Sequence, residues 1–72
     1  MDDELVPTLD EIRNTWPATV GLLRAARAFG ISRSHAYALV RRNEFPARTL
    51  AVGGVIRVVT SSIIKALTED DG

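Results

Sequence analysis

The sequence contains no cysteine and only one histidine, His35. Without cysteine the chain forms no disulfide, offers no thiolate nucleophile and builds no cysteine-based zinc site. A single imidazole does not make a metal site by itself, because zinc sites need several protein ligands. We therefore expect a protein that holds no metal and no other cofactor.

Long apolar runs are also missing. No stretch of the 72 residues approaches the roughly 18 apolar residues that a membrane-spanning helix needs. The opening residues, MDDELVPTLDEIRNTW, have neither the basic start nor the apolar segment of a secretion signal. The length is enough for one small domain. We expect a soluble, cytoplasmic protein with no membrane partner.

Acidic residues are almost absent from the middle of the chain, although the formal net charge is zero. All nine basic residues lie between positions 12 and 65 together with one acid, Glu44, so this segment carries a charge of +8. The other acids are near the ends: Asp2, Asp3, Glu4, Asp10, Glu11, Glu69, Asp70 and Asp71. Such clustering is typical of a phosphate-binding surface. An ordinary solvated surface with acidic ends that aid solubility is the alternative interpretation.

Two short helices joined by a tight turn are predicted in the middle of the chain. Apolar residues recur at helical spacing over about residues 22–29, and Gly30 stands where a left-handed residue ends a helix. Ser32 then supplies a side-chain cap for a helix from residue 33 to about 42 or 43. A connection this short, with glycine at its start, is typical of a helix-turn-helix.

The flanking segments predict two further helices and a β-hairpin. Thr8 and Glu11 have the capping-box spacing, so a short helix is expected from about residue 9 to 14 or 15. Two apolar, β-branched runs flank a Gly-Gly pair, which indicates a hairpin with a two-residue turn. A last helix is expected over about residues 62–67, with caps offered by Thr60, Ser61 and Ser62.

The expected fold is therefore mainly α with a small β-hairpin. Residues 1–18 form an acidic N-terminal arm and a short helix, which is an addition to the helix-turn-helix unit. Residues 19–68 form that unit, and residues 69–72 form an acidic flexible tail.

A helical wheel of the third predicted helix separates a core side from a basic side. Ala36, Leu39 and Val40 fall within about a 100° arc that faces the core. The opposite side carries small, hydroxylated and arginine side chains and no acid. Such a face suits the DNA major groove, where small residues allow close approach and arginines donate to base edges or phosphates. The candidate DNA-binding residues are Ser32, Arg33, Ser34, Tyr37, Arg41 and Arg42.

Individual members of this set also have a plainer explanation. Arg41 and Arg42 stabilise the end of a helix whatever its function, and Tyr37 is equally consistent with packing. Arg24, on the preceding helix, either contacts backbone phosphate or is only solvated. The combination, more than any single residue, predicts nucleic-acid binding.

The segment AARAFGISRSHAYALVRRNEFPAR, followed by VGGVIRV and IIKAL, resembles the excisionase family of DNA-binding proteins. These are small MerR-like winged-helix domains that include phage recombination directionality factors, and the arginine-rich basic set is similar to the actinobacteriophage branch. The resemblance runs from about residue 19 to 67. It implies a winged helix-turn-helix, with a recognition helix in the major groove and a wing at the adjacent minor groove or backbone. Arg48 and Arg57 stand at the matching basic wing positions.

Two features depart from the family pattern. Asn43 replaces the common glycine before Glu44, which is tolerable because asparagine accepts a left-handed conformation. The wing tip, AVGGVI, is unusually apolar where the family carries basic or aromatic residues. Its Val52, Val55 and Ile56 either contact a neighbouring protein or, at alternate positions, complete the core.

These features favour a sequence-specific DNA-binding protein over an enzyme. The acids lie near the ends, the lone histidine lies on the basic helix, and no Gly-rich phosphate loop or nucleophile–base pair is visible. We therefore expect no catalytic residues and no small-molecule substrate. A pure protein-interaction module would have no need of the +8 segment.

Within the family, two roles compete. One is an architectural excisionase that binds repeated sites cooperatively, bends DNA and directs an integrase toward excision. The other is a small MerR-like transcriptional regulator. A single module buries only about 600 to 1,000 Å² on DNA, too little to select a unique site alone. MerR-type regulators add a dimerising coiled coil, and no heptad segment follows the winged-helix region here.

The excisionase role is therefore the preferred expectation. It implies three partners: double-stranded DNA, further copies of the chain in head-to-tail association, and a phage integrase. The expected compartment is the cytoplasm of a bacterial host cell.

Overall fold

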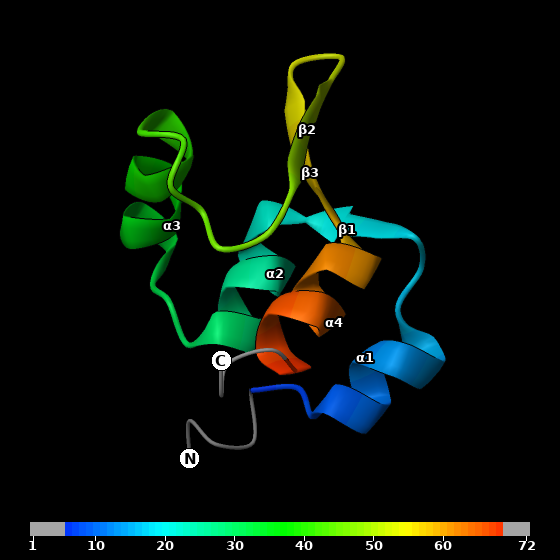
Figure 1. Cartoon of the computed structure of the whole chain (residues 1–72). Coiled ribbons are helices and arrows are strands. Elements are labelled where there is room, and N and C mark those ends of the chain that lie inside the picture. The colour runs from blue at the N-terminus through cyan, green and yellow to red at the C-terminus, as the bar shows by residue number, and fades with distance from the viewer. Residues whose placement is uncertain (1–5, 69–72) are drawn as a thin grey trace.

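Residues 6–68 of the computed structural model form four helices and a three-stranded antiparallel sheet (Figure 1). The structure describes these residues; the acids at positions 2–4 and 69–71, and with them the expected acidic tail, lie outside the described residues. The elements in chain order are α1 (Leu9–Thr15), β1 (Thr19–Gly21), α2 (Leu22–Phe29), α3 (Arg33–Arg41), β2 (Thr49–Val52), β3 (Val55–Val59) and α4 (Thr60–Thr68). The fold is mixed α/β, where the sequence led us to expect a mainly helical one.

The difference arises from β1, a strand that the sequence pattern did not predict. β1 pairs antiparallel with β3, so that Val20 lies opposite Val58 and the strand order is β1-β3-β2. Both valines are buried, with exposed fractions of 2% and 0%. A three-residue strand is too short to show alternation in the sequence. It forms because β3 offers a pairing edge and because Val20 fills the core beneath it.

β2 and β3 form the expected hairpin. Gly53 and Gly54 make the turn with φ angles of +57° and +83°, as a two-residue turn with two left-handed positions requires. Val52 and Val55 close the turn as paired residues. The hairpin projects beyond the helices, with α3 standing to one side of it (Figure 1).

α2 and α3 both end in a left-handed residue, and only Gly30, Ile31 and Ser32 separate the two helices. Gly30 follows α2 with a φ of +69°, and Asn43 follows α3 with a φ of +63°. After Asn43 the amide of Glu44 donates back to a carbonyl of α3 at 2.7 Å, which satisfies a helix-end acceptor. The expected tolerance of asparagine at this position is thus confirmed, as is the Ser32 cap, whose Oγ accepts from the backbone at 3.3 Å.

One core joins every helix to β1 and β3. Ile12 of α1 and Ile63 of α4 are fully buried in it, and the ring of Phe29 packs edge-on against Phe45 with centroids 5.9 Å apart. The buried apolar side chains are Ile12, Val20, Leu22, Ala25, Ala26, Ala36, Val58 and Ile63. The core therefore holds α2 against the sheet and α3 against α2.

α4 follows β3 without a linker and begins two residues earlier than the sequence indicated. Two of the three hydroxyls expected to cap it, those of Thr60 and Ser62, make other hydrogen bonds. Thr60 is buried, its Oγ1 donates to the Pro17 carbonyl, and its amide donates to the Ala18 carbonyl at 2.8 Å. The Oγ of Ser62 accepts from the amide of Arg48 at 2.9 Å. These contacts join the start of α4 to the segment before β1 and to the base of the hairpin.

Candidate nucleic-acid interface

α3 turns one side toward the core and the other toward solvent. Ala36 is fully buried, Val40 packs against the core and Leu39 is half-buried. Ala38, which the helical wheel places on the outer side, is also half-buried. The predicted core side is confirmed, and the exposed side is correspondingly narrower than the wheel indicates.

The exposed side of α3 frames an open hollow. Its lining residues are Ser32, Arg33, Ser34, Tyr37 and Arg41. All are exposed, and the exposed fraction of Tyr37 is 41%. The structure therefore brings these predicted DNA-binding residues onto one continuous surface, and none of the described residues that line it is acidic.

Arg42, the remaining member of the predicted set, is the C-terminal cap of α3 and has an acidic neighbour. Its Nη1 lies 3.6 Å from Oε1 of Glu44, and both side chains are more than half exposed. This is the single ion pair found among residues 6–68. An exposed pair of this kind stabilises the fold little, but it offsets part of the charge of Arg42. Arg33 and Arg41 have no such partner within residues 6–68.

A second hollow lies between α3, the start of α2 and the tip of the hairpin. It is lined by Gly21, Leu22, Leu23, Arg24, Tyr37, Gly54, Val55 and Ile56. Tyr37 lines both hollows. Its side chain thus connects the basic surface of α3 with the hairpin tip, so the two regions form one uninterrupted face.

Arg24 has a specific partner in the N-terminal segment. The Cζ atom of Arg24 lies 5.6 Å from the centroid of the Trp16 ring, within the range of a cation–π contact. Trp16 is partly buried against the core. The side chain of Arg24 is therefore held by an aromatic ring. The sequence had left solvation and phosphate contact as the two alternatives for this residue.

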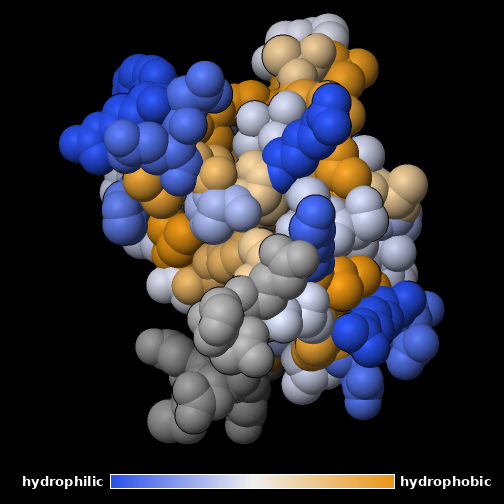
Figure 2. Space-filling model, viewed as in Figure 1, coloured by the Kyte–Doolittle hydropathy of each residue, from blue (hydrophilic) through white to orange (hydrophobic). Residues whose placement is uncertain are grey.

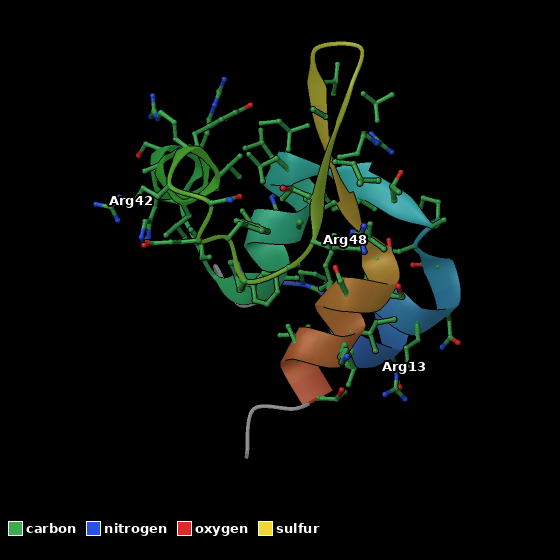
Figure 3. All side chains as sticks on the ribbon, turned by 45° about the horizontal axis from the view of Figure 1, so that its top comes forward. Arg13, Arg42 and Arg48 are labelled. Atoms are coloured by element: carbon green, nitrogen blue, oxygen red, sulfur yellow. The ribbon has the colours of Figure 1, made fainter. Side chains whose placement is uncertain are left out.

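The two arginines at the predicted wing positions differ in their surroundings. Arg57 is half-buried, and its guanidinium donates to Thr19 of β1, from Nε to Oγ1 at 3.3 Å and from Nη2 to the carbonyl at 3.0 Å. Arg48 is exposed and lies at the foot of the hairpin beside α4, well separated from Arg42 on α3 (Figure 3). The side chain of Arg48 therefore presents its charge to solvent, while that of Arg57 bridges two strands.

The sequence left two interpretations open for the apolar residues at the hairpin tip, and each of them holds for part of the set. Val52 and Val55 are 58% and 55% exposed. Ile56 is half-buried and packs against the core. Figure 2 shows hydrophobic surface at the projecting hairpin and a concentration of hydrophilic side chains over α3. Ile56 completes the core, and the two valines are the part of the tip available to a partner.

Two further features of residues 6–68 bear on chemistry. No group of three or more His, Cys, Asp or Glu side chains within this range is close enough to hold a metal ion. No helix in the same range is long and apolar enough to cross a membrane.

The sequence analysis gave no role at this face to two residues. Leu23 lines the second hollow, and Trp16 contacts Arg24. A signal for Leu23 was present, because this apolar residue lies outside the set of buried positions of α2. Its side chain is 41% exposed. For Trp16 no local signal existed, since its partner lies eight positions further along the chain.

Comparison with known proteins gives no match. Neither a protein-family model, nor a curated protein, nor a solved structure matches this chain. A function is therefore inferred from its own residues and geometry.

Proposed function

We propose that the chain is a DNA-binding protein in which α2 and α3 act as a helix-turn-helix and the β2–β3 hairpin acts as the wing of a winged helix. One observation carries the proposal: Arg33, Arg41 and Tyr37 line a single exposed hollow of α3 in which no residue of the described range 6–68 is acidic. The DNA major groove admits an α-helix, and arginine donates two hydrogen bonds to the edge of guanine. α3 is the recognition helix in this arrangement.

The distribution of charge supports the same proposal. The segment between residues 12 and 65 carries +8, and its one acid faces Arg42 at the end of α3. Each arginine that neutralises a phosphate releases a counterion, which gives binding a steep salt dependence. Ser32 and Ser34 lie at the start of α3, where free helix amides also favour phosphate.

The biological role we propose is that of a phage excisionase. In this role several copies bind repeated sites head to tail, bend the DNA and direct an integrase toward excision. Support comes from the small area that one such module buries on DNA, because it covers too few base pairs to select a unique site. The exposed Val52 and Val55 supply an apolar contact for the neighbouring copy.

The DNA-binding proposal is tested first with a selected site. Duplexes enriched from a random-sequence pool supply the sequence, and gel shifts then use fragments with one, two or three copies of it. We expect stepwise cooperative complexes whose affinity falls with salt at a log–log slope of about −0.9 per phosphate neutralised. Enrichment no better than that of an Arg33→Ala/Arg41→Ala double variant would remove the proposal.

The role in recombination needs a separate assay. An integrase whose attachment region contains the enriched sequence is supplied with integration and excision substrates, with and without the protein. We expect the protein to inhibit integration and stimulate excision. A single saturable complex on a palindromic site, with no effect on recombination, would instead favour the small MerR-like transcriptional regulator.

A further inference from the structure

Trp16 and Arg24 form a contact that joins the N-terminal segment to the candidate interface. Trp16 is held in place through both its backbone and its side chain. Its backbone amide donates to the carbonyl of Ile12 at 3.3 Å, and its side chain packs against the core. Ile12 is fully buried. The ring is therefore a fixed platform, and the Cζ atom of Arg24 lies 5.6 Å from its centroid.

Arg24 is also one of the residues that line the second hollow, together with Tyr37 of α3 and Val55 of the hairpin tip. A free arginine side chain loses rotamer freedom when it binds a ligand, and stacking on a fixed ring removes part of that freedom beforehand. The contact thus prepares the guanidinium for binding at the place where α2, α3 and the hairpin meet.

The type of contact matters for charge. A carboxylate partner would orient Arg24 but would also neutralise it, as Glu44 does in part for Arg42. The aromatic ring orients the guanidinium through its quadrupole and leaves the net charge in place. Among residues 6–68 Arg24 has no acidic partner within ion-pair distance. An oriented and unneutralised arginine is suited to a phosphate group.

We propose that Trp16 is a positioning residue that holds Arg24 in place to bind a DNA backbone phosphate at the second hollow. This inference rests on the proposed DNA-binding function and extends it to the segment before β1. The N-terminal segment then contributes to affinity without touching DNA, because its aromatic ring acts through Arg24.

A double-mutant cycle on the enriched duplex tests the proposal. The variants are Trp16→Leu, Trp16→Phe, Arg24→Ala and the double variant Trp16→Leu/Arg24→Ala. We expect Trp16→Leu to weaken binding about two- to fivefold, the range that a cation–π contact at an exposed site provides. Trp16→Phe keeps an aromatic face and restores part of the loss. In the Arg24→Ala background, Trp16→Leu has no further effect.

Two further readouts separate positioning from general stability. Arg24→Ala lowers the salt slope by about 0.9, the loss of one phosphate contact. Trp16 is the only tryptophan, so its fluorescence reports directly on the ring: emission changes when DNA is added to the wild type, and the change is much smaller in Arg24→Ala. Arg13→Ala is the matched control, because Arg13 is an exposed arginine of α1 on the side of the molecule away from α3 (Figure 3).

Each result has a defined meaning, provided that circular dichroism shows every variant to be folded at the temperature of the assay. Equal losses from Trp16→Leu in both backgrounds would show that Trp16 acts through the fold and would overturn the positioning role. An Arg24→Ala variant with wild-type affinity and salt slope would overturn the phosphate contact while leaving the α3 interface intact. Failure of the wild type to bind any enriched duplex would overturn both the proposed function and this inference.

Discussion

Arg57 of β3 donates two hydrogen bonds to Thr19 of β1, one to its hydroxyl and one to its carbonyl. The residues are 38 positions apart in the sequence, and the contact crosses from the central strand to the short outer strand. β1 has only three residues, so its backbone pairing with β3 is short. The guanidinium therefore contributes to holding β1 on the sheet.

Replacement of Arg57 by alanine is expected to lower the free energy of unfolding by about 1 to 2 kcal/mol, because hydrogen bonds from a charged donor are lost at a half-buried position. Urea unfolding followed by circular dichroism measures the change. Arg48→Ala serves as control, since the exposed Arg48 side chain can be removed while its backbone amide still donates to Ser62. A salt slope lowered by about 0.9 in Arg57→Ala would show that Arg57 also contacts a phosphate.

The arginines of α3 are expected to differ in their effect on DNA binding. Arg33→Ala and Arg41→Ala each weaken the free energy of DNA binding by about 1 to 3 kcal/mol if the arginines contact base edges. Arg42→Ala costs less, because Glu44 already offsets part of its charge. Equilibrium titrations on the enriched duplex at fixed salt provide the comparison. Wild-type binding by both Arg33→Ala and Arg41→Ala would show that α3 does not read DNA.

The exposed valines at the hairpin tip are expected to contribute to cooperative binding of several copies to repeated DNA sites. Val52→Ser with Val55→Ser weakens the cooperative step on a fragment with repeated sites. It changes single-site affinity little, because it removes no basic side chain and an exposed substitution changes the free energy of unfolding by no more than about 0.5 kcal/mol. Gel shifts on one-site and three-site fragments separate the two quantities. Ile56→Ser is the contrasting variant: it places a hydroxyl against the core and lowers stability by about 2 kcal/mol. A larger loss on the one-site fragment would assign the valines to direct DNA contact.

The left-handed residue after α3 gives a prediction about stability alone. Asn43 has a φ of +63°, a conformation that costs a residue with a Cβ about 1 kcal/mol or more. Asn43→Ala is therefore expected to lower the thermal midpoint, and Asn43→Gly to leave it unchanged or raise it. The order glycine, asparagine, alanine in thermal unfolding checks the assignment; alanine at least as stable as glycine would contradict it.

Much of the fold was predictable because its signals are local. The Gly53–Gly54 turn, the left-handed Gly30 and the Ser32 cap each act on residues within a few positions along the chain. β1 had no such signal, because three residues carry no periodicity of their own and the strand exists only by pairing with β3. The start of α4 was misplaced for a similar reason, since Thr60 bonds to the segment before β1.

The candidate site was predictable to the same extent. The basic side of α3 follows from helical spacing, because a helix repeats its faces every few residues. The surroundings of individual arginines do not follow from spacing. Arg24 stacks on Trp16, Arg42 faces Glu44 and Arg57 bonds to Thr19, and only Arg42 and Glu44 lie close together in the sequence.

The sequence by itself determined that this chain forms short helices around one hairpin and gathers positive charge in its middle, because caps, turns and helical periodicity act over a few residues. The tertiary structure alone decided which arginines are held by partners, which hairpin residues pack inward and that Trp16, after α1, lies against Arg24. These depend on which surfaces meet when the core closes, and residues distant in the chain, such as Thr19 and Arg57, meet only then.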